Sequence, residues 1–340
     1  MEELTRPGRS PRADGRPPTE EPARREWLAP FAVDVAGVLS VHRRGYGDPA
    51  FATDDGGAIW RACRTPDGPG TVRVTARAGG ATTTWRGGPG GSSPRGPTLV
   101  DATAWGPGAG WLLDALPGLL GADDRPEDFV PGHPALRAAA RSRPPVRIGR
   151  SWLVMEALVP AVLEQKVVGM EATRAWRSLL WRFGEPAPGP VPVGMRVPPD
   201  PRAWASIPSW EWHRAGVEAV RARVIAAAAR VATRLEEVTT MCSCDADRRL
   251  RAIPGIGPWT SAEIRQRACG DADAVSVGDY HLPSIVGWAL AGRAVDDAEM
   301  LELLAPYGGH RHRASILAGL TGTGPPRRVP RLAVRDYRAF

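Results

Sequence analysis

Residues 250–282 constrain the fold more than any other part of this chain, because they join a glycine hairpin to a single acidic residue 22 positions later (279 − 257). The hairpin Pro254-Gly255-Ile256-Gly257 ends a helix at Ile253, since proline lacks a backbone donor and glycine favours a turn. A new helix begins at Pro258, where proline is tolerated in the first turn. The free backbone N–H groups at such a helix start bind an anion such as phosphate. A contact of this kind reads no base sequence.

Length and charge limit the classes of protein to which the chain can belong. Its 340 residues are enough for two domains, each with its own core. The net charge of +7 favours a polyanionic partner. The sequence has no apolar run of about 20 residues, and its N-terminal segment lacks the apolar stretch of a signal peptide. We therefore expect a cytoplasmic, nucleoid-associated protein that does not enter a membrane.

The cysteines do not predict a disulfide framework or a zinc site. Cys63, Cys242, Cys244 and Cys269 are too few and too irregularly spaced for a disulfide scaffold. No further Cys or His pair completes a zinc pattern with Cys242 and Cys244. We expect ordinary reduced thiols.

Composition and periodicity divide the chain into four parts. We expect a disordered basic tail over 1–28, an N-terminal α+β domain over 29–130, a helical region over 131–320 and a basic C-terminal tail over 321–340. Short β-rich runs predict a small antiparallel sheet, with a helix after it that ends at Gly121: the runs are 33–35, 38–41, 58–62, 71–76 and 82–85, and the helix is 109–120. Apolar residues at helical spacing predict a helix over 151–183, bent or divided at Pro160 and Gly169. Further helices are expected over 213–238, 245–253, 258–269, 279–292, 296–305 and 310–320.

Three motifs resemble one family of DNA repair enzymes. The hairpin with its flank, PGIGPWT (254–260), the loop VGDYHL (277–282) and the helix AVLEQKVV (161–168) are similar to the DNA-3-methyladenine glycosylase II family of the helix-hairpin-helix–GPD superfamily. The resemblance covers roughly residues 30–320 and is strongest over 150–320. It implies an α+β fold, in which a small N-terminal antiparallel β domain with a helix precedes a mostly α-helical glycosylase region of two subdomains. The hairpin unit would occupy 245–270.

By this resemblance Asp279 is the catalytic residue. Breaking an N-glycosidic bond passes through a sugar with oxocarbenium character, so a fixed carboxylate stabilises the developing positive charge and orients or deprotonates water. The alternative is that Asp279 only caps its helix, where its side chain would accept backbone hydrogen bonds. The two roles can coexist.

Lysine content bears on whether the enzyme also cleaves the DNA strand. Bifunctional members of the superfamily carry a Schiff-base lysine just after the hairpin, where this chain has Trp259, and Lys166 is the only lysine in the sequence. A Schiff base needs an amine, so only Lys166 or the N-terminal amine could supply one. We therefore expect a monofunctional enzyme without AP-lyase activity, in which water attacks the sugar.

The resemblance also assigns a base pocket and a DNA wedge. Trp259 and Tyr280 would line the pocket, where an indole face attracts an electron-poor or cationic base. The alternative is that both side chains belong to the core. Some relatives have an aromatic residue one turn after this tryptophan, whereas this chain has Glu263. Gln165 and Lys166 would fill the gap left by the flipped base, or else simply lie at a solvated helix end.

Backbone groups of the hairpin would hold phosphate and an ion. Gly255 and Gly257, with Thr260, would contact a DNA phosphate beside the lesion. By resemblance, the main-chain carbonyls of Arg251, Ile253 and Ile256 would bind a monovalent cation. No cofactor is expected to be required. The iron–sulfur cluster of another superfamily branch needs four cysteines near the C-terminus, where this chain has none.

The sequence therefore predicts a monomeric, monofunctional glycosylase that binds double-stranded DNA with damaged bases. It would flip out alkylated purines such as 3-methyladenine and 7-methylguanine and excise them by hydrolysis in base excision repair. The main alternative is a non-catalytic helix-hairpin-helix module that only grips DNA. A transcriptional regulator that senses alkylation and an oxidised-purine glycosylase-lyase are both disfavoured, the latter by the missing lysine.

Overall fold

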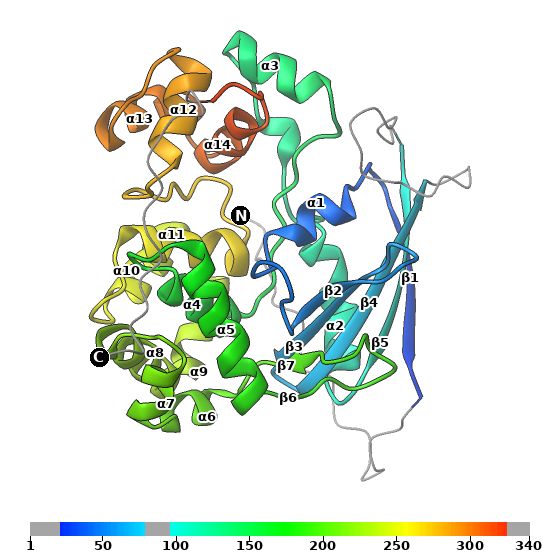
Figure 1. Ribbon diagram of the computed structural model, residues 1–340. Coiled ribbons are helices and arrows are strands. Elements are labelled where there is room, and N and C mark those ends of the chain that lie inside the picture. Colours follow the sequence, from blue (N-terminus) through cyan, green and yellow to red (C-terminus); the bar gives the residue numbers. More distant parts are fainter. Residues whose placement is uncertain (1–20, 79–95, 325–340) are drawn as a thin grey trace.

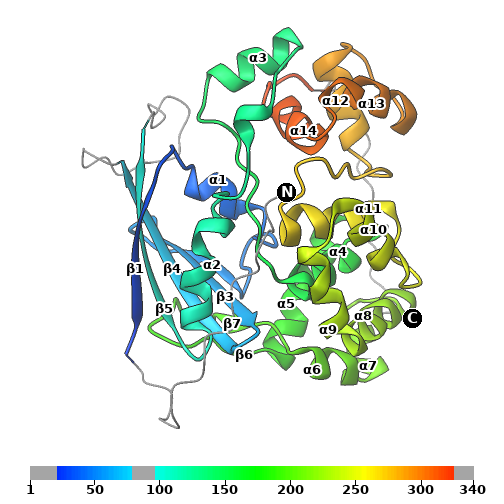
Figure 2. The same cartoon turned by 180° about the vertical axis from the view of Figure 1, so that it is seen from behind.

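The computed structural model describes residues 21–78 and 96–324. A twisted antiparallel sheet stands to one side of two helical bodies, as the two opposite views show (Figures 1 and 2). The strand order is β1-β5-β4-β3-β2, with every neighbouring pair antiparallel. The strands are β1 (Ala23–Ala29), β2 (Phe51–Thr53), β3 (Ile59–Thr65), β4 (Gly68–Ala78) and β5 (Thr98–Trp105).

One face of the sheet is covered by helix α2 (Ala109–Leu119), with helix α1 (Val35–Ser40) packed on the same core. Along β5 the side chains alternate between buried and half-buried, which is the pattern of a strand with one face on a core. Helix α2 packs on β1, β4 and β5 through Trp111, Leu112 and Leu116, and the chain leaves it through Gly121 at φ 82°. The predicted α+β domain with an antiparallel sheet and a following helix is confirmed.

Two local predictions about this domain are wrong. Residues 23–28, which we assigned to the disordered tail 1–28, belong to strand β1, which pairs with β5 along its length. The runs 33–35 and 38–41, which we predict to be β-rich, overlap helix α1 (Val35–Ser40) instead. Asp34 caps this helix by accepting a hydrogen bond from Gly37 N–H at 2.8 Å. Val35 and Leu39 are buried on one face of that helix because they are four residues apart. The predicted strand 82–85 lies outside the described residues, as do 1–20 of the N-terminal tail and 325–340 of the C-terminal tail.

The central helical body holds the largest core. It consists of α4 (Val154–Leu163), α5 (Gly169–Phe183), α6 (Pro201–Ser206), α7 (Ser209–Arg214), α8 (Ala219–Arg230), α9 (Ala232–Glu236), α10 (Ser243–Arg251) and α11 (Pro258–Ile264). Short segments complete it: strands β6 (Glu185–Pro186) and β7 (Arg196–Val197), the 3-10 turn η2 (Glu237–Thr240) and the π-helical turn η3 (Arg265–Cys269). The predicted division of the helix 151–183 is confirmed, with the break at residues 164–168 and Pro160 inside α4.

A second helical body joins segments far apart in the sequence. Helix α3 (Pro134–Arg141) packs with α12 (Leu282–Leu290), α13 (Asp297–Leu304) and α14 (Arg311–Gly319) around a separate core (Figure 1). The 3-10 turns η1 (Pro126–Asp128) and η4 (Ala305–Tyr307) complete the described elements. The chain crosses between the bodies through the loop after Gly270, whose left-handed φ of 69° ends η3. Asp279 lies in this loop. Within residues 21–78 and 96–324, no helix combines the length and apolar character that crossing a membrane requires.

Candidate functional site

Both carboxylate oxygens of Asp279 are held by hydrogen bonds. Oδ1 accepts from the backbone N–H groups of His281 at 2.8 Å and Leu282 at 2.9 Å, at the start of α12. Oδ2 accepts from the indole Nε1–H of Trp259 at 3.0 Å. The residue therefore caps α12 with one oxygen and pairs with α11 through the other. This arrangement fixes the carboxylate between the two helical bodies.

The two predicted aromatic pocket residues differ in their surroundings. Trp259, the second residue of α11, is half-buried, and its N–H is committed to Asp279. Tyr280 is 68% exposed and makes an edge-on contact with His281, with ring centroids 4.9 Å apart. Neither side chain is a buried core residue. The structure therefore brings Trp259 to Asp279 and leaves Tyr280 on the surface beside them.

Gln165 connects the loop after α4 to the hairpin. Its Nε2 donates to the carbonyl of Gly255 at 2.9 Å and to the hydroxyl of Thr260 at 2.8 Å. Lys166, the next residue, is exposed and has a left-handed backbone at φ 54°. A non-glycine residue with positive φ is uncommon, and the tight turn between α4 and α5 carries this strain. Gln165 therefore braces the hairpin, while Lys166 stands free of it at the surface.

The two hairpin positions suit glycine for different structural reasons. Gly255 has φ 95°, and a Cβ there would overlap Cγ2 of Val224 on α8. Gly257, the N-cap residue of α11, has an ordinary φ of −91° and open space where a Cβ would lie. The first glycine is thus required by the fold itself. The second leaves the backbone bare on the side where a ligand could approach closely.

The three carbonyls predicted to hold a cation lie at the end of α10 and in the hairpin. The Ile253 oxygen accepts a hydrogen bond from Ile256 N–H at 3.0 Å. Within the described part of the chain, the carbonyls of Arg251 and Ile256 accept no hydrogen bond. Carbonyl oxygens that accept no hydrogen bond are available as ligands for a hard cation, which prefers oxygen.

Glu263 anchors a buried polar network that the sequence did not reveal. Its carboxylate accepts from Ser276 Oγ at 2.6 Å and from Arg267 Nη1 at 2.7 Å. Gln266 Nε2 in turn donates to Ser276 Oγ at 2.9 Å. Burial disfavours the charged form of Glu263, but the Arg267 charge and the Ser276 hydrogen bond outweigh it and lower the carboxyl pKa. The network ties α11 to the loop that carries Asp279.

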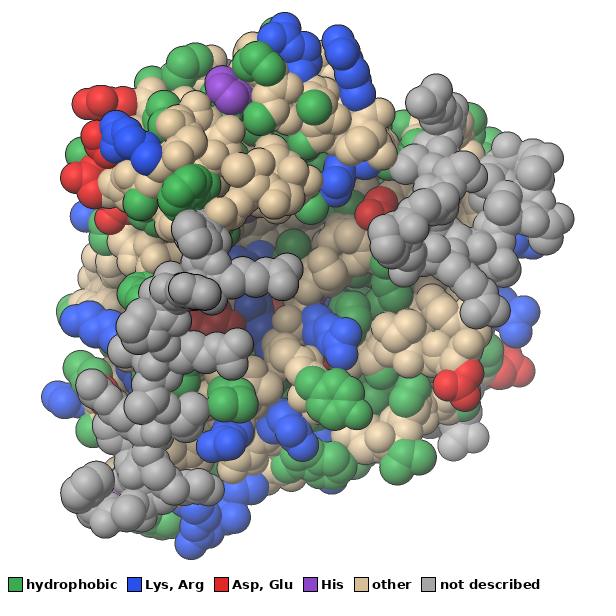
Figure 3. Space-filling view, turned by 45° about the horizontal axis from the view of Figure 1, so that its top comes forward, with side chains coloured by type: hydrophobic (Ala, Val, Ile, Leu, Met, Phe, Trp, Pro, Cys, Tyr) green, Lys and Arg blue, Asp and Glu red, His purple; other side chains and the backbone are tan. Residues whose placement is uncertain are grey.

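A second pair of charges lies at the same place. The Arg44 guanidinium lies 3.6 Å from Glu164, the residue that follows α4. Burial raises the pKa of the Glu164 carboxyl; Arg44 and Arg267 oppose this shift, and Glu263 and Asp279 add to it. Burial, together with the Arg267 charge, lowers the pKa of Arg44 to about 10. In the space-filling view, side chains of both charges show at the bottom of a hollow between the two helical bodies (Figure 3).

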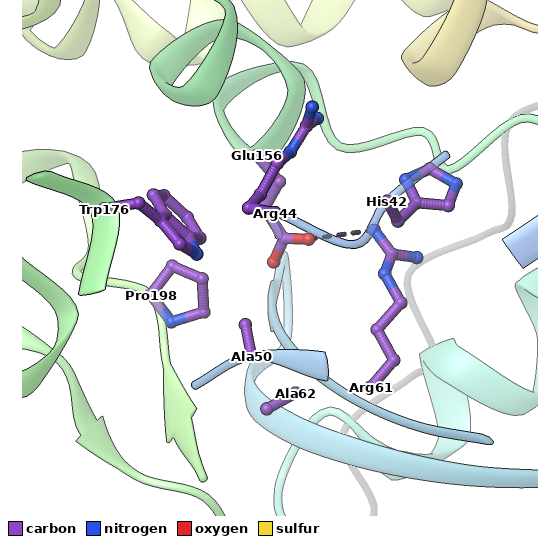
Figure 4. Close-up of a pocket in the computed structure, with 8 residues that line it drawn as sticks. All are labelled: His42, Arg44, Ala50, Arg61, Ala62, Glu156, Trp176 and Pro198. Carbon is purple, nitrogen blue, oxygen red and sulfur yellow. Dashed lines mark hydrogen bonds and ion pairs between the residues drawn. The ribbon is translucent and has the colours of Figure 1, made fainter. Parts of the chain in front are cut away.

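Two cavities lie near the site residues' domains, and neither contains these residues together. One, with a volume of about 20 Å³, is lined by His42, Arg44, Arg61, Glu156 and Trp176, with Arg61 and Glu156 paired at 3.0 Å (Figure 4). That is room for one water molecule, not for a base. The other, about 830 Å³, is lined by residues of β3, α2, α4, α5, α6, α8 and α9, and contains none of the predicted site residues. The size of a cavity therefore does not mark the site.

The comparisons with known proteins agree with this arrangement. No family model matches the chain. It is 31% identical over 168 residues to the probable bifunctional transcriptional activator/DNA repair enzyme AlkA from two strains of Mycobacterium tuberculosis. The match covers 48% of this chain and 34% of those relatives, so the chain spans about a third of their length.

Among solved structures, the 3-methyladenine DNA-glycosylase from Archaeoglobus fulgidus superposes with a TM-score of 0.67 at 19% identity, covering 87% of this chain and 97% of that one. The 8-oxoguanine glycosylase/lyase from Clostridium acetobutylicum gives 0.61 at 9% identity, covering 87% and 96%. The chain thus has the fold of the helix-hairpin-helix DNA glycosylases. The predicted resemblance to the DNA-3-methyladenine glycosylases is confirmed.

Proposed function

We propose that this chain is a monofunctional DNA glycosylase that excises alkylated purines from duplex DNA by hydrolysis. The observation that carries the proposal is the carboxylate of Asp279, which Trp259 and two backbone N–H groups hold beside the hairpin. The AlkA relatives are described as DNA repair enzymes, and the Archaeoglobus fulgidus protein as a 3-methyladenine glycosylase. The first description supports a role in DNA repair, and the second supports an alkylated purine as the substrate.

In this mechanism the hairpin grips the DNA next to the lesion. The bare backbone at Gly257 and the N–H groups that open α11 bind a phosphate, and Gln165 keeps Gly255 and Thr260 in register. The open carbonyls of Arg251 and Ile256, with that of Ile253, would hold a monovalent cation that adds positive charge at this point. Lys166 lies at the tip of the neighbouring turn, where it can enter the duplex as the base leaves.

The flipped base would stack on the half-buried indole of Trp259. Stacking holds a flipped base without reading its sequence, and an indole face attracts a cationic base. As the glycosidic bond lengthens, the Asp279 carboxylate stabilises the positive charge on the sugar and orients the attacking water. N-alkylation weakens this bond, so that a single carboxylate is sufficient.

Hydrolysis without a Schiff base is supported by the scarcity of amines, since the sequence has a single lysine and the residue after the hairpin is Trp259. Lys166 is exposed in the turn between α4 and α5, whereas Asp279 pairs with α11. Borohydride should therefore trap no covalent adduct between protein and DNA during turnover. An adduct that disappears in Lys166→Ala would instead show a lyase.

The test of the proposed function is base release from methylated duplex DNA by the wild type, Asp279→Asn and Asp296→Asn. Asp296 is a matched control, because it caps α13 by accepting from Glu299 N–H at 2.9 Å and lies outside the site. Wild type and Asp296→Asn should release 3-methyladenine and 7-methylguanine, and Asp279→Asn should be about 10²- to 10³-fold slower.

The cap that Asp279 provides to α12 favours one rival, a module that only binds DNA. If the wild type and Asp279→Asn bind DNA equally and neither releases a base, that rival is correct.

A further inference from the structure

Asp279, Glu263 and Glu164 place three carboxylates at this site, and of these only that of Glu164 accepts no hydrogen bond within the described part of the chain. Asp279 uses both oxygens, and Glu263 accepts from Ser276 and Arg267. Within residues 21–78 and 96–324, the Glu164 carboxylate has one polar contact, the ion pair with Arg44 at 3.6 Å, which is longer than a hydrogen bond. A half-buried carboxylate without a hydrogen-bond donor has acceptor positions free for a further partner.

Glu164 is also placed where a ligand can reach it. Its side chain is 33% exposed, whereas that of Glu263 is 12% exposed and faces the network between α11 and its loop. The next residue, Gln165, is bonded to the hairpin, which fixes the position of the Glu164 backbone relative to α11. Thr260, which Gln165 contacts, is the residue after Trp259. Trp259 donates to Asp279, so the end of α4 and Asp279 are linked through the start of α11.

The charges around Glu164 favour a cation. Arg44 pairs with Glu164 and Arg267 with Glu263, whereas Asp279 accepts only from neutral donors, the indole of Trp259 and two backbone N–H groups. One of the three carboxylates therefore has no cationic partner among the described residues. Arg267 is bonded to Glu263, and the Arg44 side chain is only 8% exposed. Neither guanidinium is therefore free to contact a ligand. A positively charged ring that carries an N–H donor would satisfy both the unpaired acceptor and the excess negative charge.

We propose, on the basis of the function proposed above, that Glu164 is a specificity-determining residue of the base pocket. Its carboxylate accepts a hydrogen bond from the edge of the flipped purine and selects bases that carry a positive charge. Purines methylated at a ring nitrogen while still attached to the sugar are such cations, and they keep N–H donors on their edges. Selection by this residue is separate from bond cleavage, which belongs to Asp279.

The experiment compares binding of two uncleavable duplexes that differ in the charge of one base. One carries 7-methylguanine on a 2′-fluorinated sugar, which resists hydrolysis; the other carries 7-methyl-7-deazaguanine, a neutral base of the same shape. The proteins are the wild type, Glu164→Gln, Glu164→Asp and the control Glu211→Gln. Glu211 is also a buried carboxylate, paired with Arg182 at 2.7 Å, but lies on α7 away from the site.

The wild type and Glu211→Gln should bind the charged base more tightly than the neutral one. Glu164→Gln should reduce this preference at least fivefold, and Glu164→Asp should keep most of it because it keeps the charge. An unchanged preference in Glu164→Gln, or equal loss of binding to both duplexes, would overturn the proposal, as would a wild type without preference. If Glu164→Gln does not fold, loss of the preference in Glu164→Asp overturns the proposal and retention supports it.

Base release from cleavable 7-methylguanine DNA is measured in parallel. A wild type that prefers the charged base but releases none would support this inference while refuting the proposed catalysis. The two failures are therefore distinguishable.

Discussion

The two glycines of the hairpin should respond in opposite ways to the same substitution. Gly255→Ala should destabilise the protein, whereas Gly257→Ala should leave stability nearly unchanged and weaken DNA binding. The contrast follows from the space around each glycine. A Cβ at Gly255 would overlap the Val224 side chain at a left-handed φ, and a Cβ at Gly257 would meet no atom within 4 Å.

The magnitude can be worked out from these geometries. At Gly255 the left-handed backbone costs roughly 1–2 kcal/mol for an L-residue. The overlap with Val224 on the neighbouring helix costs roughly 1–3 kcal/mol more. We therefore expect Gly255→Ala to lower the free energy of unfolding by about 2–5 kcal/mol. At Gly257, alanine is a poorer N-cap than glycine but restricts the unfolded chain, and the two effects largely cancel, to within about 1 kcal/mol.

The assay is urea unfolding together with binding to an undamaged duplex. Gly257→Ala should bind DNA at least about tenfold more weakly if its backbone approaches a phosphate, since about 1.4 kcal/mol corresponds to a factor of ten. Val224→Ala provides the matched test of the clash. Because it removes the atoms that the new Cβ would overlap, the double variant with Gly255→Ala should lose only the stability that the left-handed backbone costs. If Gly257→Ala binds DNA like the wild type, the hairpin backbone does not contact phosphate and the reasoning is refuted.

Two further predictions concern the surroundings of the site. Trp259→Phe keeps an aromatic face but removes the donor to Asp279 Oδ2, and a hydrogen bond to a charged group is worth roughly 1.5–3 kcal/mol. Base release should therefore fall about tenfold or more, with little change in DNA binding. Release at the wild-type rate would refute this. Burial, reinforced by Arg267 against the opposing charge of Glu263, lowers the pKa of His312 to about 4. Between the unfolded value of about 6.5 and that pKa, the unfolded chain binds a proton that the folded chain does not, so stability falls as pH drops, by at most about 1.4 kcal/mol per unit. His312→Gln should flatten this part of the stability curve in urea unfolding measured from pH 7 to pH 4, and an unchanged slope would contradict the assignment.

The sequence predicts the helical bodies well because their signals are local. Pro254, Gly255 and Pro258 place the ends of α10 and α11 without knowledge of the rest of the chain. Gly121 and Gly270 mark the ends of helical segments for the same reason, since their left-handed backbones suit glycine. Elsewhere in the central body the predicted boundaries are wrong. The helix expected over 213–238 is divided into the end of α7, then α8, α9 and η2, and α6 lies where no helix was expected.

The errors fall where pairing or burial decides the structure. Strand β1 has the composition of a charged tail, Ala-Arg-Arg-Glu-Trp-Leu-Ala, and becomes a strand because it pairs with β5 at the edge of the sheet. In α1, the short apolar run around Val35 and Leu39 fits both the two-residue period of a strand and the 3.6-residue period of a helix. Packing on the domain core selects the helix. Neither outcome can be read from the segment alone.

The charged pairs of the site could not be predicted for a related reason. Glu263 and Ser276 are 13 residues apart, and Arg44 and Glu164 lie in different domains; only the packed structure brings them together. In the sequence, Glu263 stood out only as a departure from an aromatic position, and Glu164 as part of a helix motif. Burial and neighbouring charges shift the pKa values of these two carboxyl groups, and neither effect can be seen in the sequence of the segment.

Asp279 shows why the capping role and the proposed catalytic role support each other. Capping of α12 needs a single oxygen, and Oδ1 accepts both backbone N–H groups. An aspartate that served only as a cap would need no partner for Oδ2, yet that oxygen is bonded to a tryptophan 20 residues earlier, on a helix of the other body. The cap therefore fixes the orientation of the carboxylate, and the indole fixes its position between the bodies. A carboxylate held in this way loses little freedom when positive charge develops beside it, which is the condition for strong electrostatic stabilisation.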